Sequence, residues 1–135
     1  MAVFFASYMP FEIITADEVL CITFQGLFDT DCLHEAVTQV ERIEAEAAVS
    51  PDRLIDLTAV ESMELTFADM KRFADIRRVA PLKNKVKSAI VAPQPVHRGF
   101  ARMFQTILEN PKITVNIFPD RNSACAWLKE GKSSR

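Results

Sequence analysis

Hydrophobic and polar residues alternate along two short stretches near the start of the chain, residues 11–15 and 19–24. A period of two is typical of strands that bury one face. Ala16-Asp17-Glu18 separates the stretches and favours a tight turn. The pattern therefore predicts an antiparallel hairpin whose second strand ends at Gly26. The apolar residues 3–5 ahead of it are predicted to add a strand or to pack at an edge.

Further along, short apolar runs alternate with segments of helical period. The runs at residues 53–57, 86–92 and 113–118 predict three buried strands. Apolar residues three and four positions apart predict helices that begin near Asp29, near Thr66, at Pro95 and after Asp120.

This order of elements predicts one α/β domain over residues 1–131, because strands that alternate with helices form largely parallel sheets. We expect a mixed, mostly parallel sheet of about five strands, with an opening antiparallel hairpin and about four helices. Residues 132–135 are expected to form a disordered tail.

The first predicted helix has one apolar and one acidic face. Its apolar stripe is Leu33, Ala36, Val37, Val40, Ile43 and Ala47. The glutamates between these positions are interpreted as a solvent-facing surface, and they are Glu35, Glu41, Glu44 and Glu46.

Composition places the chain among single-domain globular proteins. Its 135 residues are enough for one substantial core, and 49% of them are hydrophobic. No apolar run approaches the roughly 18 residues that span a bilayer. The first residues lack the basic segment and cleavage site of an export signal, and the 3 cysteines match no disulfide framework. A cytoplasmic location with reduced thiols is expected, with Cys21 and Cys125 buried.

Charge is divided unevenly along the chain. Residues 1–64 carry 13 acidic and 2 basic side chains, and residues 65–135 carry 5 acidic and 14 basic ones, so the halves hold −11 and +9 and sum to −2. Either the folded protein has an acidic face and a basic face, which favours a charged partner or a homodimer, or the two halves interleave and screen each other. The second alternative is favoured.

The sequence carries no recognised catalytic motif, so no catalytic residue is predicted. The phosphate-binding loops, the hydrolase elbow and the zinc-protease motif are missing, and 2 histidines with 3 scattered cysteines supply no metal-ligand set. No cofactor and no metal are therefore expected. Seven basic residues fall within 71–87, but the pI of about 5.7 and the missing aromatic pattern argue against nucleic-acid binding.

One candidate anion contact lies at the start of the third predicted helix. Arg98 and Arg102 are four positions apart and share a helix face, with His97 nearby, where backbone N–H groups favour anions. They are candidates for holding a phosphate, a lipid headgroup or an acidic partner. Alternatively, the two arginines pair with glutamates of the first helix.

The second predicted helix has apolar residues over a wide arc: Phe67, Met70, Phe73, Ala74 and Ile76. An apolar surface rimmed by basic residues marks a protein partner or a peripheral lipid contact. A large core also uses such residues, and this alternative is favoured.

Three stretches resemble the STAS domain, and within it the SpoIIAA-like branch: QGLFDTDCLHEAV, LIDLTAV and ITVNIFPDRNSACAWL. The resemblance covers about Phe11 to Gly131 and implies the fold of anti-sigma-factor antagonists. The same branch is similar to the lipid-binding CRAL-TRIO fold, which implies a hydrophobic ligand.

The resemblance also bears on the segment between strand 53–57 and the second helix. Antagonist STAS domains carry an Asp-Ser-Ser-Gly motif there, and phosphorylation of its serine breaks a partner interface. The motif falls on Glu64-Leu65-Thr66-Phe67, so the acidic residue survives while Leu65 replaces the phosphoserine. Thr66 is the remaining candidate phosphoacceptor, although it is expected to cap the helix.

The leading hypothesis is a non-enzymatic STAS-like domain that binds a protein partner or a hydrophobic ligand. The expected contact residues are Glu61, Glu64, Leu65, Thr66, Phe67 and Met70. A phospho-regulated antagonist that uses Thr66 is the first alternative. A small hydrolase or isomerase that uses Asp56, Glu64 or His97 is the second.

Overall fold

The computed structural model of the protein describes residues 3–5 and 10–130. Its strands are β1 (Val3–Phe5), β2 (Phe11–Ala16), β3 (Val19–Asp29), β4 (Asp52–Glu64), β5 (Val86–Val91) and β6 (Ile113–Phe118). Its helices are α1 (Thr30–Glu46), α2 (Phe67–Arg78), α3 (Pro95–Ile107) and α4 (Arg121–Lys129). The predicted α/β architecture is confirmed, with residues 3–5 adding the edge strand. The tail predicted at 132–135 lies outside the described residues.

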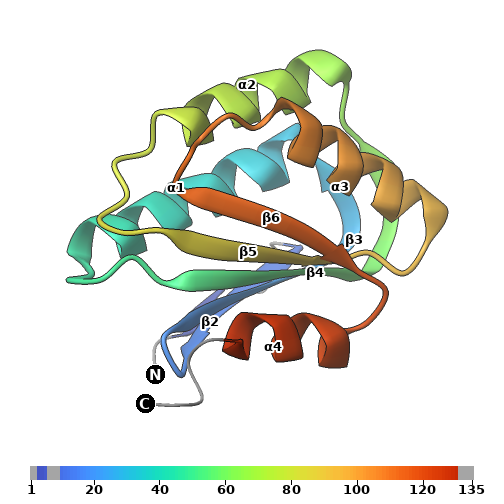
Figure 1. Ribbon diagram of the computed structural model, residues 1–135. Helices are drawn as coiled ribbons and strands as arrows, with labels where there is room; N and C mark the ends of the chain where they lie inside the picture. Colours follow the sequence, from blue (N-terminus) through green and yellow to red (C-terminus); the bar gives the residue numbers. More distant parts are fainter. Residues whose placement is uncertain (1–2, 6–9, 131–135) are drawn as a thin grey trace.

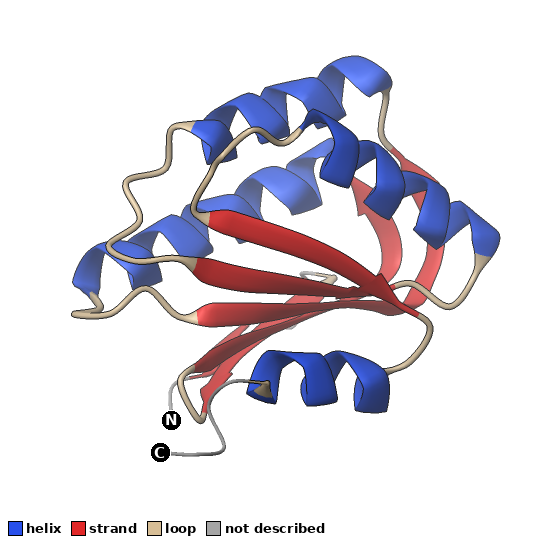
Figure 2. Ribbon diagram, viewed as in Figure 1, coloured by secondary structure: helices blue, strands red, loops and turns tan. Residues whose placement is uncertain are grey.

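The strands lie in the sheet in the order of the chain, β1-β2-β3-β4-β5-β6. The pairs β1–β2 and β2–β3 are antiparallel, and β3 to β6 are parallel. Right-handed crossovers that all step in one direction place their helices on one face of a sheet. Accordingly α1, α2 and α3 cover one face, and α4, which follows the last strand, lies on the other (Figures 1 and 2).

The opening hairpin turns at Asp17 and Glu18, as the alternation predicts. Both residues have positive φ, 52° and 64°, and they join two strands that pair from Ala16–Val19 onward. Positive φ at both central residues is the signature of a two-residue turn whose twist matches that of the flanking strands.

Strands β3 and β4 are longer than the sequence predicts, and this corrects the expected end of the second strand at Gly26. Gly26 has φ +67° and lies between two register shifts of the β3–β4 pair. A glycine in this conformation forms a bulge that bends a strand without ending it. Beyond Asp56, where pairing with β5 stops, β4 continues along β3 to Glu64. The segment between the predicted strand 53–57 and the second helix is therefore largely strand.

Each face of the sheet has its own hydrophobic core. The larger core fills part of the space between the sheet and α1–α3, and Leu33, Ala36, Val37 and Val40 contribute the predicted stripe of α1. The smaller core, Leu54, Ala89, Val91, Ala124 and Leu128, joins α4 to the sheet. Cys21 and Cys125 are half-buried, which corrects their expected burial. No helix in the described residues is long and apolar enough to cross a membrane.

Candidate functional site

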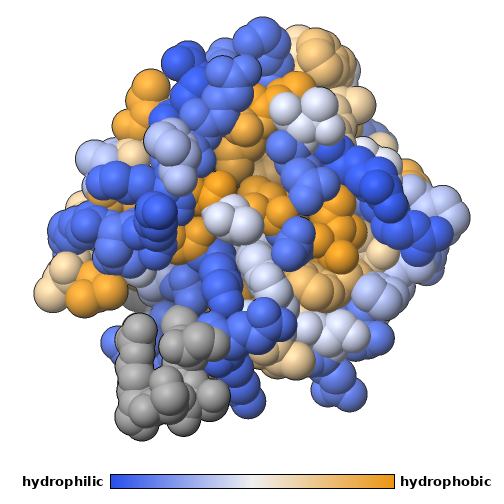
Figure 3. Space-filling model, viewed as in Figure 1, coloured by the Kyte–Doolittle hydropathy of each residue, from blue (hydrophilic) through white to orange (hydrophobic). Residues whose placement is uncertain are grey.

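A hollow lies between the sheet and the three helices of the first face. Its walls are mostly apolar and include Ile22, Phe24, Phe28, Phe73, Phe100 and Phe104. Its cavity volume is about 60 Å³, and its mouth is open to solvent. The hollow is therefore narrow and partly enclosed. Figure 3 shows apolar surface exposed within a depression between polar outer surfaces.

The position of α2 explains why this space is not filled. Figure 1 shows α2 as the outermost helix, above α1 and α3 and away from the sheet. Met70 and Ala74 bury their side chains under it, and Phe73 stacks on Phe104 of α3 at a ring-centroid distance of 4.9 Å. Helix α2 thus rests on its neighbours and leaves a gap over the strands beneath.

Both ends of α2 are anchored by polar contacts. At the N-terminus, the Thr66 hydroxyl accepts a hydrogen bond from the Asp69 N–H (3.1 Å), and the Asp69 carboxylate accepts from the Thr66 N–H (3.0 Å). This capping box confirms the predicted role of Thr66 as the helix cap. The Thr30 hydroxyl donates to the same carboxylate (2.8 Å) and ties α2 to α1. At the C-terminus, Asn110 donates to the Arg77 carbonyl (2.8 Å).

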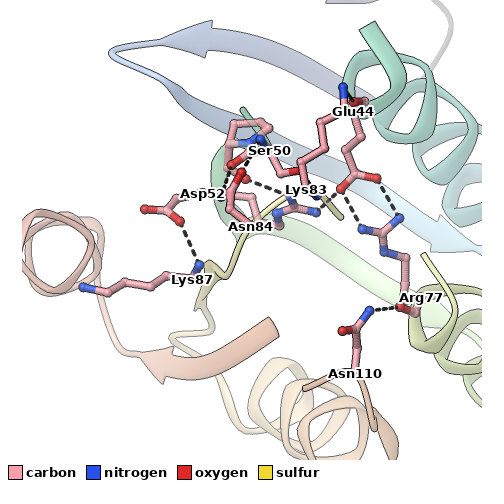
Figure 4. Close-up of polar contacts among 10 residues, drawn as sticks. Glu44, Ser50, Asp52, Arg77, Lys83, Asn84, Lys87 and Asn110 are labelled. Atoms are coloured by element: carbon pink, nitrogen blue, oxygen red, sulfur yellow. Dashed lines mark hydrogen bonds and ion pairs between the residues drawn. The ribbon is translucent and has the colours of Figure 1, made fainter. Parts of the chain in front are cut away.

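A buried cluster of charged side chains closes one end of the hollow. The Glu44 carboxylate of α1 accepts hydrogen bonds from Arg53 of β4 (2.6 Å) and from both terminal nitrogens of Arg77 of α2 (3.1 and 2.7 Å). Arg53 and Arg77 are each 4% exposed, and both line the hollow. Figure 4 shows the Glu44 carboxylate facing the Arg77 guanidinium. The sequence places these residues 9 and 33 positions from Glu44, and only the fold brings them together.

Glu44 remains ionised in this environment. Burial alone would raise the pKa of Glu44, but the hydrogen bonds from Arg77 and the charge of Arg53 outweigh it and lower the pKa. Burial lowers the pKa of Arg53 from that of a free guanidinium. Buried ion pairs seldom stabilise a fold more than apolar residues of the same size would, so their presence beside a hollow suggests a role in binding.

The cluster corrects the interpretation of Glu44 as a solvent-facing residue. Glu44 is 9% exposed, and it lies four positions after Val40 and seven after Val37, on the buried stripe of α1. Arg77 likewise follows Met70 and Ala74 on the buried face of α2. The signal was present in the helical period: polar residues at apolar positions must find buried partners.

The predicted contact segment between β4 and α2 is partly a surface. Glu61, Glu64 and Thr66 are exposed, Phe67 is 57% exposed, and Leu65 packs in part against the core. Met70 is 2% exposed and lies inside the core. An external partner would therefore contact the end of the β3–β4 ribbon and the first turn of α2, but not Met70.

The fold separates the three residues predicted to form an anion contact at α3. His97 is 1% exposed, and its Nε2 donates to the Val60 carbonyl at 3.0 Å, so the ring points into the protein and joins α3 to the ribbon. Arg98 donates to the Pro93 carbonyl (2.7 Å), whereas Arg102 is exposed. Among the described residues, neither arginine forms an ion pair with α1.

The residues considered for catalysis do not converge. Asp56 binds Arg121 on the α4 face, Glu64 lies at the surface and His97 is held by Val60. None of the three lines the hollow or the outer groove between α2 and α3, which is bordered by charged residues such as Lys71, Asp75 and Glu109. Within residues 10–130, no group of three or more His, Cys, Asp and Glu side chains is placed to hold a metal.

Comparison with known proteins finds similar folds among solved structures and no match among family models or curated sequences. No protein-family model matches the chain, and no curated protein sequence matches it either. Among solved structures, it is similar to an uncharacterised DUF3478-family protein with a SpoIIAA-like fold from Shewanella loihica PV-4. That alignment has a TM-score of 0.59 and 17% identity and covers 87% of this chain and 91% of the other.

A second similar structure is the anti-sigma-factor antagonist SpoIIAA in its unphosphorylated form. Its TM-score is 0.56 with 12% identity, and the match covers 90% of this chain and 98% of that one. The chain therefore has a SpoIIAA-like α/β fold, and the predicted resemblance is confirmed at the level of the fold.

Proposed function

We propose that this protein is a non-enzymatic binding domain whose hollow beneath α2 takes a hydrophobic ligand. The observation that carries the proposal is the narrow, partly enclosed space between the sheet and α1–α3, with phenylalanine side chains along its wall. Small-molecule sites are typically concave and mostly apolar, with a few polar groups that fix orientation. Here the polar groups are Arg53, Arg77 and Ser88.

Binding of 1-decanol tests this function, because the alcohol carries an apolar chain and no charge. We expect chemical-shift changes in nuclear magnetic resonance spectra that concentrate on residues of the hollow. The variant Ala36→Phe adds a ring to the wall and should lose this binding, whereas Ala126→Phe adds the same ring to the exposed side of α4 and should retain it. A folded Ala36→Phe protein that binds 1-decanol normally would reject the proposal.

A protein partner is a second candidate, favoured by the 57% exposure of Phe67 beside the exposed Glu61 and Glu64. The role of SpoIIAA as an anti-sigma-factor antagonist supports a protein contact of this kind. Self-association is its simplest form, with the segment from Glu61 to Phe67 as the contact. Light scattering at increasing concentration tests it: the native chain should dimerise and Phe67→Asp should not. A native monomer at high concentration argues against this contact.

Regulation by phosphorylation of Thr66 remains the alternative. The helix N-terminus favours a phosphate, but the Asp69 carboxylate is already bonded to the cap and repels one. We therefore favour a Thr66 that serves only as a cap. Intact mass after treatment with a cognate kinase decides this: an added phosphate on Thr66 supports regulation, and an unchanged mass supports the cap.

A further inference from the structure

We infer that the ligand of the hollow is an amphipathic monoanion, an unbranched alkyl carboxylate whose head lies at Arg53 and whose chain runs along the phenylalanines. This inference rests on the proposed function and adds the chemical class of the ligand. Three features of the cluster and the hollow carry it: one surplus positive charge, one buried donor without a partner, and a narrow apolar space.

The first feature is the charge on the α1–α3 face. Arg53 and Arg77 carry two positive charges there, and Glu44 supplies one negative charge. The adjacent acidic residue, Asp52, has the strand parity of Leu54, which packs under α4, and its carboxylate accepts from the Lys87 N–H at 2.8 Å. Its negative charge also raises the pKa of Arg53, but by less than the positive charge of neighbouring Arg77 lowers it. Figure 4 shows Asp52 turned toward Lys87 and away from Glu44. The three residues at the end of the hollow thus carry a net charge of about +1.

The second feature is the Nε of Arg53. The terminal nitrogens of Arg53 donate to Glu44 (2.6 Å) and to the Pro51 carbonyl (2.8 Å), but its Nε is buried and has no hydrogen-bond partner among the described residues. A buried donor that belongs to a charged group is costly to leave without a hydrogen bond. A carboxylate oxygen is the acceptor that satisfies it and also neutralises the surplus charge.

The third feature is the shape of the space. Arg53 and Phe28 line the hollow from opposite ends of the β3–β4 pair, where Arg53 is level with Leu20 and Phe28 with Met63, so the space is elongated along the strands. An unbranched methylene chain suits an elongated space of this kind better than a ring system does. The polar end holds Arg53, Arg77 and Ser88, and the far wall holds Phe28 and Phe100, which are 5.2 Å apart between ring centroids.

Decanoate, 1-decanol and decyl phosphate, titrated below their aggregation limits by calorimetry, test the inference. Decanoate should bind roughly 10- to 100-fold more tightly than 1-decanol, the gain expected from one charge-assisted hydrogen bond to a buried group. Decyl phosphate should bind less tightly than decanoate, because its larger, more highly charged head exceeds the single surplus charge.

The variant Arg53→Met should remove the difference in affinity between decanoate and 1-decanol. The matched control is Arg121→Met, which removes the same charge from the opposite face, where Arg121 pairs with Asp56. It should leave both affinities unchanged. If Arg53→Met does not fold, nuclear magnetic resonance of the native protein with isotope-labelled arginine replaces it: decanoate should shift the Arg53 Nε–H signal and 1-decanol should not.

The outcomes separate the two proposals. Equal affinity for decanoate and 1-decanol, or an unshifted Arg53 signal with decanoate bound, overturns the monoanion and leaves the hydrophobic site intact. Tighter binding of decyl phosphate than of decanoate also overturns the carboxylate and assigns the head to a phosphate. No binding of any of the three overturns the inference together with the proposed function.

Discussion

The two faces of the sheet differ in how completely their helices fill the space above the strands. On the α4 face, a short helix lies directly on β4, β5 and β6, and Leu54, Ala89, Ala124 and Leu128 are all at most 3% exposed. On the other face, three longer helices cover the strands, and a hollow remains beneath α2. The larger layer is therefore the less completely filled one.

The ion pairs of the two faces also differ, in how far their side chains are exposed to water. On the α4 face, Arg121 binds Asp56 at 2.8 Å; the Asp56 side chain is 8% exposed, but the arginine side chain is 47% exposed, so water reaches one side of the pair. On the α1–α3 face, Glu44, Arg53 and Arg77 have side chains that are 10%, 5% and 5% exposed. The comparison indicates that one face is closely packed, while the other keeps buried charge and empty space, the two features on which the proposed ligand site depends.

Replacing Glu44 should give the largest loss of stability among the variants proposed for the two faces. Glu44→Gln leaves two buried guanidinium groups without their carboxylate, and we predict a loss of about 3–5 kcal/mol in the free energy of unfolding. Urea denaturation measures it. A loss below about 1 kcal/mol would mean that water or an anion reaches the cluster freely.

Enlarging one alanine on each face tests the difference in packing. Ala89→Leu on the α4 face should cost about 1–3 kcal/mol, because Ala89 is 0% exposed in a filled core. Ala36→Leu on α1 should cost less than about 1 kcal/mol, because the added atoms enter the hollow. Equal losses in urea denaturation would show that the two faces are equally filled.

Acid should weaken the protein through carboxylates on both faces. Against the opposing effect of burial, partner hydrogen bonds and charges lower the pKa of Glu44 and of Asp56 below the ordinary values of 4.5 and 3.8. A lowered folded pKa contributes stability that is present above the ordinary pKa and lost as pH falls through the folded one. Denaturation curves should show stability falling below about pH 4.5, with a shallower fall in Glu44→Gln. An unchanged slope in that variant would contradict the role given to Glu44.

Weakening the Asp56–Arg121 pair, in which only the arginine is exposed, should give the smallest loss of stability. Asp56→Asn weakens the bond to Arg121 but retains an acceptor for the Thr58 N–H, which lies 2.9 Å from the Asp56 carboxylate. We predict a loss of about 1 kcal/mol or less. A loss as large as that of Glu44→Gln would remove the distinction between the two faces.

Local signals in the sequence predicted most of the fold. Local signals include the turn at Asp17 and Glu18, the helix caps at Thr66 and Asp120 and the proline at the start of α3. The first helix was expected to be capped by one of residues 29–31, and the structure selects Asp29. All of these signals act within one or two turns of the chain. Such contacts depend on neighbouring residues alone, so a single sequence reveals them. The alternation of strands and helices then limited the topology to a few sheets.

The candidate site depended on contacts that no local pattern reports. The extension of β4 to Glu64 required β3 as a partner past the bulge at Gly26, and the burial of Glu44 required two arginines from other elements. Periodicity alone predicts which positions face a core, but it does not say whether that core closes. The sequence by itself therefore determined the elements and their order. The tertiary structure decided that α2 stands away from the sheet, because the separation of packed layers follows from how side chains of distant segments meet.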